Sequence, residues 1–331
     1  MNMRTVKMLL AIAGLLAAVL APPPTYSYLL NLTVPMGGGA PQPDRWDFSS
    51  FPVAWNINPS HGSNIQGSRS VVDVIQASFN TWTSAPNATL RVSRGADSSI
   101  SSENASPSNV NLICFVCSDA DFTKDAQTLA VTITTAADAP GEPDGHGGTT
   151  RFAGQLIKAD IIFNPQTQYT TDGGGSLQDL QTVATHEIGH FFGLAHSAVV
   201  RAVMSPAASD LRTLAYDDVA GLFVLYPAAS PQVPTGAISG TVRLAGAGVF
   251  GAHVYAQSVT MALPFASTIR KTPIGILTRP DGSYTIQGLP ADSYVVIAEP
   301  LDGPVENDDV KGYSPAFGRA AVQTNFTTRW H

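Results

Sequence analysis

The stretch HEIGHFFGLAH, residues 186–196, decides which fold and which chemistry are expected of this chain. On an α-helix, residues four apart lie on one face, so His186 and His190 can direct their imidazole rings at one ion. Gly193 suits the point where a helix ends in a left-handed conformation, after which the chain can turn back and present His196 as a third ligand. Neutral imidazole suits Zn²⁺, and three protein ligands leave a fourth position open for water, as in catalytic zinc sites. The spacing therefore predicts one zinc ion held by these three histidines.

Glu187 directly follows the first of these histidines. A carboxylate at this position can reach a water on the metal and accept its proton, which is the role of a general base. A histidine pair on a helix is by itself more often incidental than a metal site. The glutamate, the glycine and the third histidine together favour the metal site.

Around the motif, the chain alternates between helix and strand patterns. Ser176 and Asp179 have the spacing of a capping box and predict where the motif helix begins. Residues 69–82 carry apolar side chains at helical spacing, whereas residues 129–133 and 156–163 have strand patterns. We expect strand 156–163 to lie at the edge of a sheet, where an extended peptide could pair with it.

Composition excludes several classes of protein. The 331 residues carry 18 Lys and Arg against 25 Asp and Glu, a formal net charge of −7, and no stretch stands out as basic. Nucleic acid is therefore not expected as a partner. Charged residues make up only 13%, which argues against a charged coiled coil or a highly charged disordered chain.

The first 27 residues have the features of a signal peptide. Arg4 and Lys7 precede an uncharged apolar run, residues 8–21, that is too short to span a bilayer comfortably. Cleavage after Ala21 or after Ser27 would leave a secreted, extracellular protein with no stable membrane insertion, and an uncleaved anchor is the alternative. In an oxidising compartment, the CxxC at residues 114–117 is expected to form a disulfide.

Proline and glycine divide the remaining chain into two units. Residues 28–45 are expected to form a flexible leader and residues 229–235 a Pro-rich linker, which separates residues 46–228 from residues 236–331. Short alternating strands with turn signals predict an all-β sandwich for the second unit. Its last predicted strand lies close to residue 331, so the sandwich could be incomplete and the chain a fragment.

The first unit resembles the metzincin metallopeptidases, whose motif is H-E-x-x-H-x-x-G-x-x-H followed by a methionine turn. Met204 lies where that turn belongs, and Ser197 after the third histidine makes the matrixin branch the nearest match. Residues 214–226 resemble the helix that closes matrixin catalytic domains. The resemblance implies an α+β domain over residues 46–228, with a twisted mixed sheet and packed helices, and makes Met204 a hydrophobic floor beneath the metal.

The same resemblance implies a secreted zinc-dependent metalloendopeptidase. It would hydrolyse peptide bonds of a protein or peptide substrate with a zinc-bound water, and Glu187 would be the general base. Matrixins often bind Ca²⁺ as well, and the loops at residues 138–144 and 172–175 could offer oxygen ligands, although such loops are more often simple turns. The chain has no Pro-Arg-Cys-Gly string and only His146 toward a second zinc site, so neither feature carries over.

The second unit resembles the carboxypeptidase regulatory-like (transthyretin-like) domain. The strings GAHV at residues 251–254 and DGSYTIQGLP at residues 281–290 carry this resemblance, and no catalytic constellation accompanies them. An accessory role is therefore expected. Two other functions stay open: an extracellular adhesion or binding protein with a vestigial protease domain, and a zinc hydrolase of a non-peptide bond. The intact Glu187 argues against the first.

Overall fold

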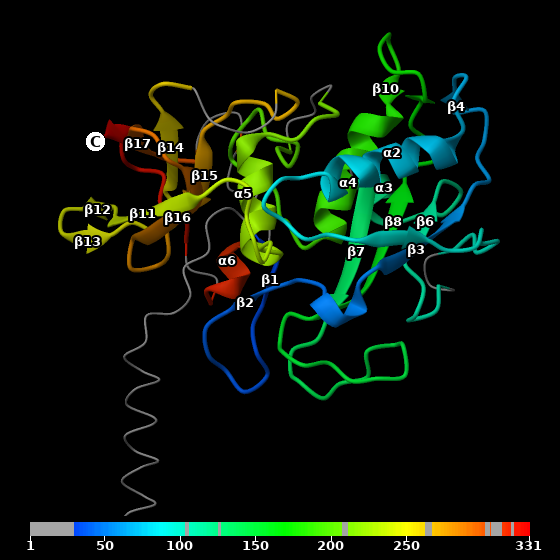
Figure 1. Ribbon diagram of the computed structural model, residues 1–331, viewed down its shortest axis with the longest axis horizontal. Helices are drawn as coiled ribbons and strands as arrows, with labels where there is room; N and C mark the ends of the chain where they lie inside the picture. Colours follow the sequence, from blue (N-terminus) through cyan, green and yellow to red (C-terminus); the bar gives the residue numbers. More distant parts are fainter. Residues whose placement is uncertain are drawn as a thin grey trace, which may run out of the picture.

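A five-stranded mixed sheet and two long helices form the first unit of the computed structural model (Figure 1). The structure describes residues 30–102, 106–124, 127–206, 211–261, 267–301, 305, 313–318 and 321–331, so the predicted signal peptide lies outside the described residues. In spatial order the strands are β5 (Val92–Arg94), β3 (Val53–Asn58), β6 (Leu112–Cys114), β8 (Leu156–Phe163) and β7 (Ala130–Ala136). The first four run parallel and β7 runs antiparallel to β8. This architecture fits the predicted α+β class.

The strand at this edge of the sheet is not the one that the sequence predicted. Strand β8, expected at the edge, lies between β6 and β7, and β7 is the outermost strand. The reason is burial: most residues of β8 are buried, so it needs a neighbour on each side, whereas β7 is largely half-buried. Any peptide that extends this sheet on the β7 side would therefore pair with β7.

Two helices pack against each other beside the sheet. Helix α2 (Val71–Thr83) begins at Ser70, whose hydroxyl accepts a hydrogen bond from the Asp73 amide at 3.1 Å. Helix α4 (Leu180–Phe191) carries the first two histidines of the motif. The indole of Trp82 on α2 donates to the Thr185 carbonyl of α4 at 2.7 Å, which fixes the two helices against one another.

The start of α4 corrects the predicted capping residue. Asp179 itself caps the helix, accepting from the Gln181 amide at 3.0 Å, and Ser176 lies outside the cap. Asp179 can do this because it ends strand β10 (Gln178–Asp179), which pairs with β9 (Tyr169–Thr170), and β9 also pairs with β4 (Ile65–Gln66). The helix ends at Phe191, and Gly193 has a φ of 92°, the left-handed conformation expected there.

Residues 30–45 pack against the first unit, which differs from the flexible leader that was expected. Strands β1 (Leu32–Thr33) and β2 (Gln42–Pro43) pair, and the amide of Asn31 donates to the Gly193 carbonyl at 3.0 Å. The indole of Trp46 donates to the Phe191 carbonyl at 2.8 Å. The last carbonyls of a helix lack partners within it, so this segment supplies donors that the end of α4 needs.

Helix α5 (Tyr216–Leu225) lies between the first unit and the strands of the second (Figure 1). The second unit contains a four-stranded antiparallel sheet with the order β15 (Ile274–Leu277), β14 (His253–Ser258), β17 (Tyr294–Glu299) and β18 (Arg329–Trp330). Strands β11 (Thr235–Thr241) and β16 (Ser283–Pro290) form a second antiparallel pair, and β12 (Arg243–Leu244) pairs with β13 (Ala247–Gly248). These strands fit an all-β unit, and the transthyretin-like identity stays a prediction.

The remaining short helices are η1 (Phe48–Ser50), α3 (Asp121–Lys124) and α6 (Tyr313–Ala316). Cys114 and Cys117 form the predicted disulfide. Among the residues described, no helix combines the length and apolar character that crossing a membrane requires.

The Pro-rich linker is held by hydrogen bonds. The side-chain amide of Asn87 donates to the Val233 carbonyl at 2.6 Å and accepts from the Val233 amide at 3.0 Å. One core of buried apolar side chains then continues from the first unit through α5 into the second, with Phe79, Leu222 and Ile276 among its members. The two units therefore share a hydrophobic core.

The Gly193→Ala substitution is expected to destabilise the fold. An added methyl group would collide with the carbonyl oxygen of Asp44, and alanine adopts a φ of 92° only with strain. Strain of this kind costs about 1–3 kcal/mol in the free energy of unfolding. Urea unfolding of the zinc-free protein measures it, with Gly37→Ala as the control because nothing lies within 4 Å of its added methyl group. Equal losses in the two variants would contradict the expectation.

Candidate metal centre

The structure brings the three predicted histidine ligands together. His186 and His190 project from α4, and His196 approaches from the loop after Gly193. One ring nitrogen of each lies within 4.8 Å of the others, and the Nε2 atoms of His186 and His190 are 3.2 Å apart. Among the described residues, no other cluster of at least three histidine, cysteine or carboxylate groups is arranged to hold a metal ion.

The backbone orients the two helix imidazoles. Nδ1 of His186 lies 2.8 Å from the Val203 carbonyl, and Nδ1 of His190 lies 2.7 Å from the Leu194 carbonyl. A carbonyl oxygen only accepts, so each neutral ring carries its proton on Nδ1 and presents a lone pair at Nε2. Two lone pairs that face each other at 3.2 Å repel unless a cation lies between them. The donor set therefore fits a divalent ion such as Zn²⁺.

Burial keeps the ring of His190 in the ligating form. It lowers the pKa of His190 well below its usual value, and the nearby His186 and His196 lower it further. A histidine that stays neutral keeps its lone pair available to a metal.

Met204 packs directly under the motif helix. Its side chain is buried, and a methyl group added at Gly189 would collide with its sulfur atom. Glycine between the two helix histidines therefore permits a close approach of this residue. The carbonyl of Met204 accepts from the Ser197 amide at 2.7 Å, so the methionine turn is bonded to the residue after the third histidine.

Glu187 is buried beside the triad, at the contact between α4 and β7. Its Oε2 accepts a hydrogen bond from the Thr132 hydroxyl at 2.6 Å. Burial raises the pKa of Glu187, while His186 and the Thr132 hydrogen bond act in the opposite direction. Sequence reasoning missed Thr132, although its polar place in the alternating pattern of residues 129–133 is a signal that could have pointed to it.

Two acidic residues in the first turn of α5 hold the loop around the centre. Asp218 accepts from the amides of Val203 at 2.9 Å, Met204 at 3.1 Å and Ala215 at 2.7 Å. Its neighbour Asp217 accepts from the Ser197 hydroxyl at 2.5 Å. The sequence placed both residues on this helix but gave neither a role.

The calcium prediction gains no support from the two loops proposed for it. Asp144 accepts from the amides of His146 at 2.9 Å and Gly148 at 2.8 Å, and Asp172 accepts from the amide and hydroxyl of Ser68. These carboxylates stabilise local turns and a contact between loops. Calcium binding stays a prediction.

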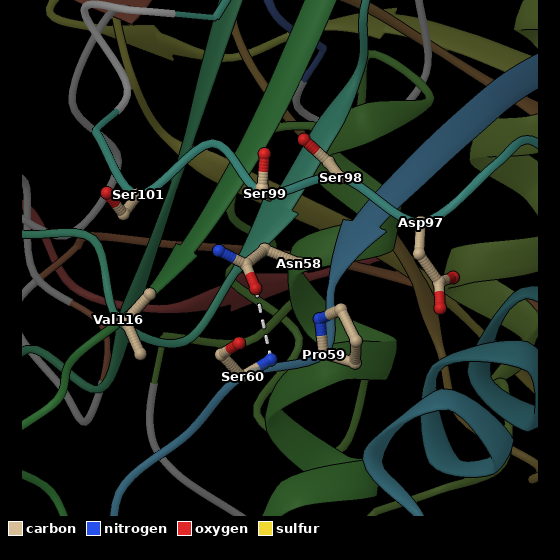
Figure 2. A pocket seen from close by; sticks show the side chains of 8 residues that line it. All are labelled: Asn58, Pro59, Ser60, Asp97, Ser98, Ser99, Ser101 and Val116. Atoms are coloured by element: carbon tan, nitrogen blue, oxygen red, sulfur yellow. Dashed lines mark hydrogen bonds between the residues drawn. The ribbon is translucent and has the colours of Figure 1, made fainter.

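A hollow of about 560 Å³ is lined by none of the motif residues (Figure 2). Its lining is made by Asn58, Pro59, Ser60, Asp97, Ser98, Ser99, Ser101 and Val116. Asn58 uses its amide within the protein: Nδ2 donates to the Ile100 carbonyl at 2.8 Å, and Oδ1 accepts from the Ser60 amide at 3.0 Å. Asp97 pairs with Arg94. The amide of Asn58 and the carboxylate of Asp97 are thus already engaged within the protein.

Comparison with known proteins identifies relatives of the motif region. Residues 121–227 match the matrixin family. Rat (Rattus norvegicus) matrilysin is 40% identical over 94 residues, which is 27% of this chain and 33% of the relative. Mouse (Mus musculus) stromelysin-1 is 40% identical over 100 residues, 27% of this chain and 20% of the relative. Soybean (Glycine max) metalloendoproteinase 1 is 34% identical over 117 residues, which is 31% of this chain and 38% of the relative.

These matches support a matrixin-like metzincin. The chain spans between a fifth and two fifths of the length of these three relatives. The matched region contains the three histidines, Glu187, Met204 and the acidic pair of α5. The matrixin assignment therefore concerns the part of the chain that builds the candidate metal centre.

The stability of the chain is expected to depend on the ionisation of Asp217. Burial raises the pKa of Asp217 from 3.8 to about 7, although hydrogen bonds from Ser197 and Gly275 lower it. Between these two pH values the folded chain keeps a proton that the unfolded chain loses, so stability falls as the pH rises through this window. Above it, this contribution is constant.

Urea unfolding of the zinc-free protein at a series of pH values tests this dependence. The free energy of unfolding of the wild type should decline relative to that of Asp217→Asn as the pH rises through the window. Parallel pH profiles of the two proteins would contradict the assignment.

Proposed function

We propose that the chain is a secreted zinc-dependent metalloendopeptidase that hydrolyses peptide bonds. The observation that carries the proposal is the convergence of His186, His190 and His196 beside the buried carboxylate of Glu187. The matrixin relatives of this region support it. Export rests on the predicted signal peptide, and the proposed substrate is a protein or peptide.

The three imidazoles would hold the zinc ion through one ring nitrogen each. When bound, zinc supplies Lewis acidity, which polarises a carbonyl and lowers the pKa of water. The chain contributes the preset tautomers of His186 and His190, which their carbonyl partners fix.

Glu187 would move the proton in this reaction. Its carboxylate accepts a proton from the attacking water and delivers it to the nitrogen of the leaving amine. The Thr132 hydroxyl donates to Oε2 and so holds the carboxylate in one orientation. Thr132 would act as a positioning residue, because its hydroxyl contacts the base.

Strand β7 would bind the substrate in an extended form. It is one of the two edge strands of the sheet, so one side of its backbone is available for pairing with a peptide. It also carries Thr132, which contacts Glu187, so a peptide paired with β7 would lie next to the general base. This arrangement favours a peptide substrate over the alternative of a non-peptide bond.

A vestigial protease domain in an adhesion protein is the other alternative. The triad, Glu187 and its Thr132 partner are all present and mutually oriented, which a domain without activity does not require. Hydrolysis of casein and of a quenched peptide library, with and without a chelator, separates the proposal from both alternatives. Chelator-sensitive cleavage of peptides supports the proposal, and zinc binding without peptide cleavage refutes it.

Removal of the Glu187 carboxylate is expected to separate metal binding from catalysis. Glu187→Ala should retain about one zinc per chain and lose at least about 10²–10⁴-fold in peptidase activity, because the proton acceptor is gone. Metal analysis and a quenched-peptide assay measure the two properties, and His190→Ala, which should lose zinc, is the control. An active Glu187→Ala protein would refute the assignment.

Loss of the Thr132 hydroxyl is expected to lower kcat. Thr132→Val keeps the shape of the side chain and removes the hydrogen bond to a carboxylate, so we expect a fall in kcat of about tenfold with KM and zinc content little changed. Thr132→Ser retains the hydroxyl and should stay near wild-type activity. If valine and serine reduce kcat equally, the hydroxyl has no positioning role.

A further inference from the structure

Strand β15 of the second unit reaches the residue that follows the third histidine through one bridging carboxylate. The amide of Gly275 on β15 donates to Oδ1 of Asp217 at 2.8 Å. The hydroxyl of Ser197 donates to Oδ2 of the same side chain at 2.5 Å. Asp217 is only 2% exposed, so these protein groups take the place of water around its carboxylate.

Ser197 is the point at which the loop carrying His196 is tied down. Its amide donates to the Met204 carbonyl at 2.7 Å, and its hydroxyl oxygen accepts from the Val199 amide at 3.0 Å. The serine hydroxyl thus links the backbone beyond His196 to Asp217. Because Ser197 directly follows His196 in the chain, these contacts also fix the backbone that carries the third imidazole.

A longer stretch of the second unit lies along the same loop. The backbones of Leu214 and Tyr216 exchange hydrogen bonds with Arg270, at 2.8 and 3.1 Å. The guanidinium of Arg270 donates to the Thr213 carbonyl at 2.7 Å and also to the Arg201 carbonyl. Residues 270–275 therefore contact both ends of the segment that runs from the methionine turn to α5.

We propose that the second unit is a positioning element of the metal centre, in which strand β15 acts through Asp217 and Ser197 to hold the chain at His196. The inference rests on the proposed function, since it takes the three histidines as zinc ligands. Asp217 and Ser197 are positioning residues, because neither belongs to the triad. The second unit then helps to position a zinc ligand, in addition to any accessory role.

Removal of the β15 donor has a defined consequence. A buried carboxylate that loses a hydrogen-bond partner must find another donor or admit water. Either change alters the side chain that accepts from Ser197 and loosens the loop at His196. Partners that hydrogen-bond directly to a metal ligand are typically worth about 10–100-fold in metal affinity, so a link one residue further out should be worth the lower end of that range, roughly tenfold.

The test uses a substitution on β15, outside the loop and the triad. A methyl group added at Gly275 would lie 2.5 Å from Nε2 of His253 and 3.0 Å from Cγ2 of Val199, so Gly275→Ala crowds the contact between β15 and the loop and must displace these side chains or β15 itself. Gly240→Ala is the matched control: its methyl group would also crowd a side chain, that of Tyr284, within the second unit. Both are full-length chains with one glycine replaced by alanine in a strand.

Zinc affinity, measured by competition with a chromophoric chelator, is the first readout. Gly275→Ala should weaken it by about tenfold, and Gly240→Ala should leave it within about twofold of wild type even if the thermal midpoints of the two variants fall equally. The absorption spectrum of the Co²⁺-loaded protein is the second readout, and it should change only in Gly275→Ala. Equal zinc affinities in the two variants would overturn the proposal.

Substitutions at Ser197 test the next link. Ser197→Ala removes the hydroxyl and should weaken zinc binding, whereas Ser197→Thr keeps it and should restore binding toward the wild-type value. A loss of the same size with alanine and threonine would indicate crowding at this position and overturn the role of the hydroxyl.

These affinity measurements are independent of proteolysis. A wild-type chain that binds zinc but cleaves no peptide refutes the proposed function and leaves the positioning role intact. A peptidase whose zinc affinity is the same in Gly275→Ala and wild type refutes the positioning role alone. A chain that binds no zinc refutes both.

Discussion

Two backbone carbonyl oxygens, those of Leu194 and Val203, orient the imidazoles on which the metal centre depends. Each accepts from an Nδ1 atom and so directs the lone pair at Nε2 toward the shared ion position. Both carbonyls lie beyond the end of α4, on the loop that also carries His196. The helix sets the spacing of two ligands, but this loop sets their direction and supplies the third. The geometry of the centre therefore depends on the conformation of the chain after Gly193.

That path is held from three sides by residues distant in sequence. The amino-terminal segment contacts Gly193 through Asn31 and covers the end of α4. Asp218 of α5 binds the amides of the methionine turn, and the second unit reaches the loop through Asp217. A loop of this length has little structure of its own, so its order must come from such contacts. The leader and the second unit, which the sequence suggested were peripheral, thus both contribute to the surroundings of the metal centre.

The parts of the structure that could be predicted from the sequence are those set by local spacing. The i, i+4 pair on α4, the left-handed glycine and the apolar pattern of α2 follow from the backbone geometry of a helix alone. The edge position of β7 and the Thr132–Glu187 contact depend on how distant strands and helices pair, which periodicity does not specify. The Asp217–Gly275 bond joins residues 58 apart across two units, and no local pattern marks it. For residues 30–45 the structure differs from the expected flexible leader, because proline and glycine content does not reveal that the end of a neighbouring helix lacks hydrogen-bond donors.

The acidic pair of α5, Asp217 and Asp218, interacts with the start of the helix, with the loop at the metal centre and with the second unit. Carboxylates in the first turn interact favourably with the positive end of the helix dipole, which offsets part of the cost of burying them. Asp218 offsets more of this cost by accepting from three backbone amides, and these include the amides that define the methionine turn. Asp217 accepts from one donor in each unit, so its burial requires that both units be in place. Burial of these carboxylates thus couples the start of α5, the loop at the metal centre and the second unit into one arrangement. A substitution in any of these three parts should alter the positions of the histidine side chains, because the same buried carboxylate oxygens accept hydrogen bonds from all three parts.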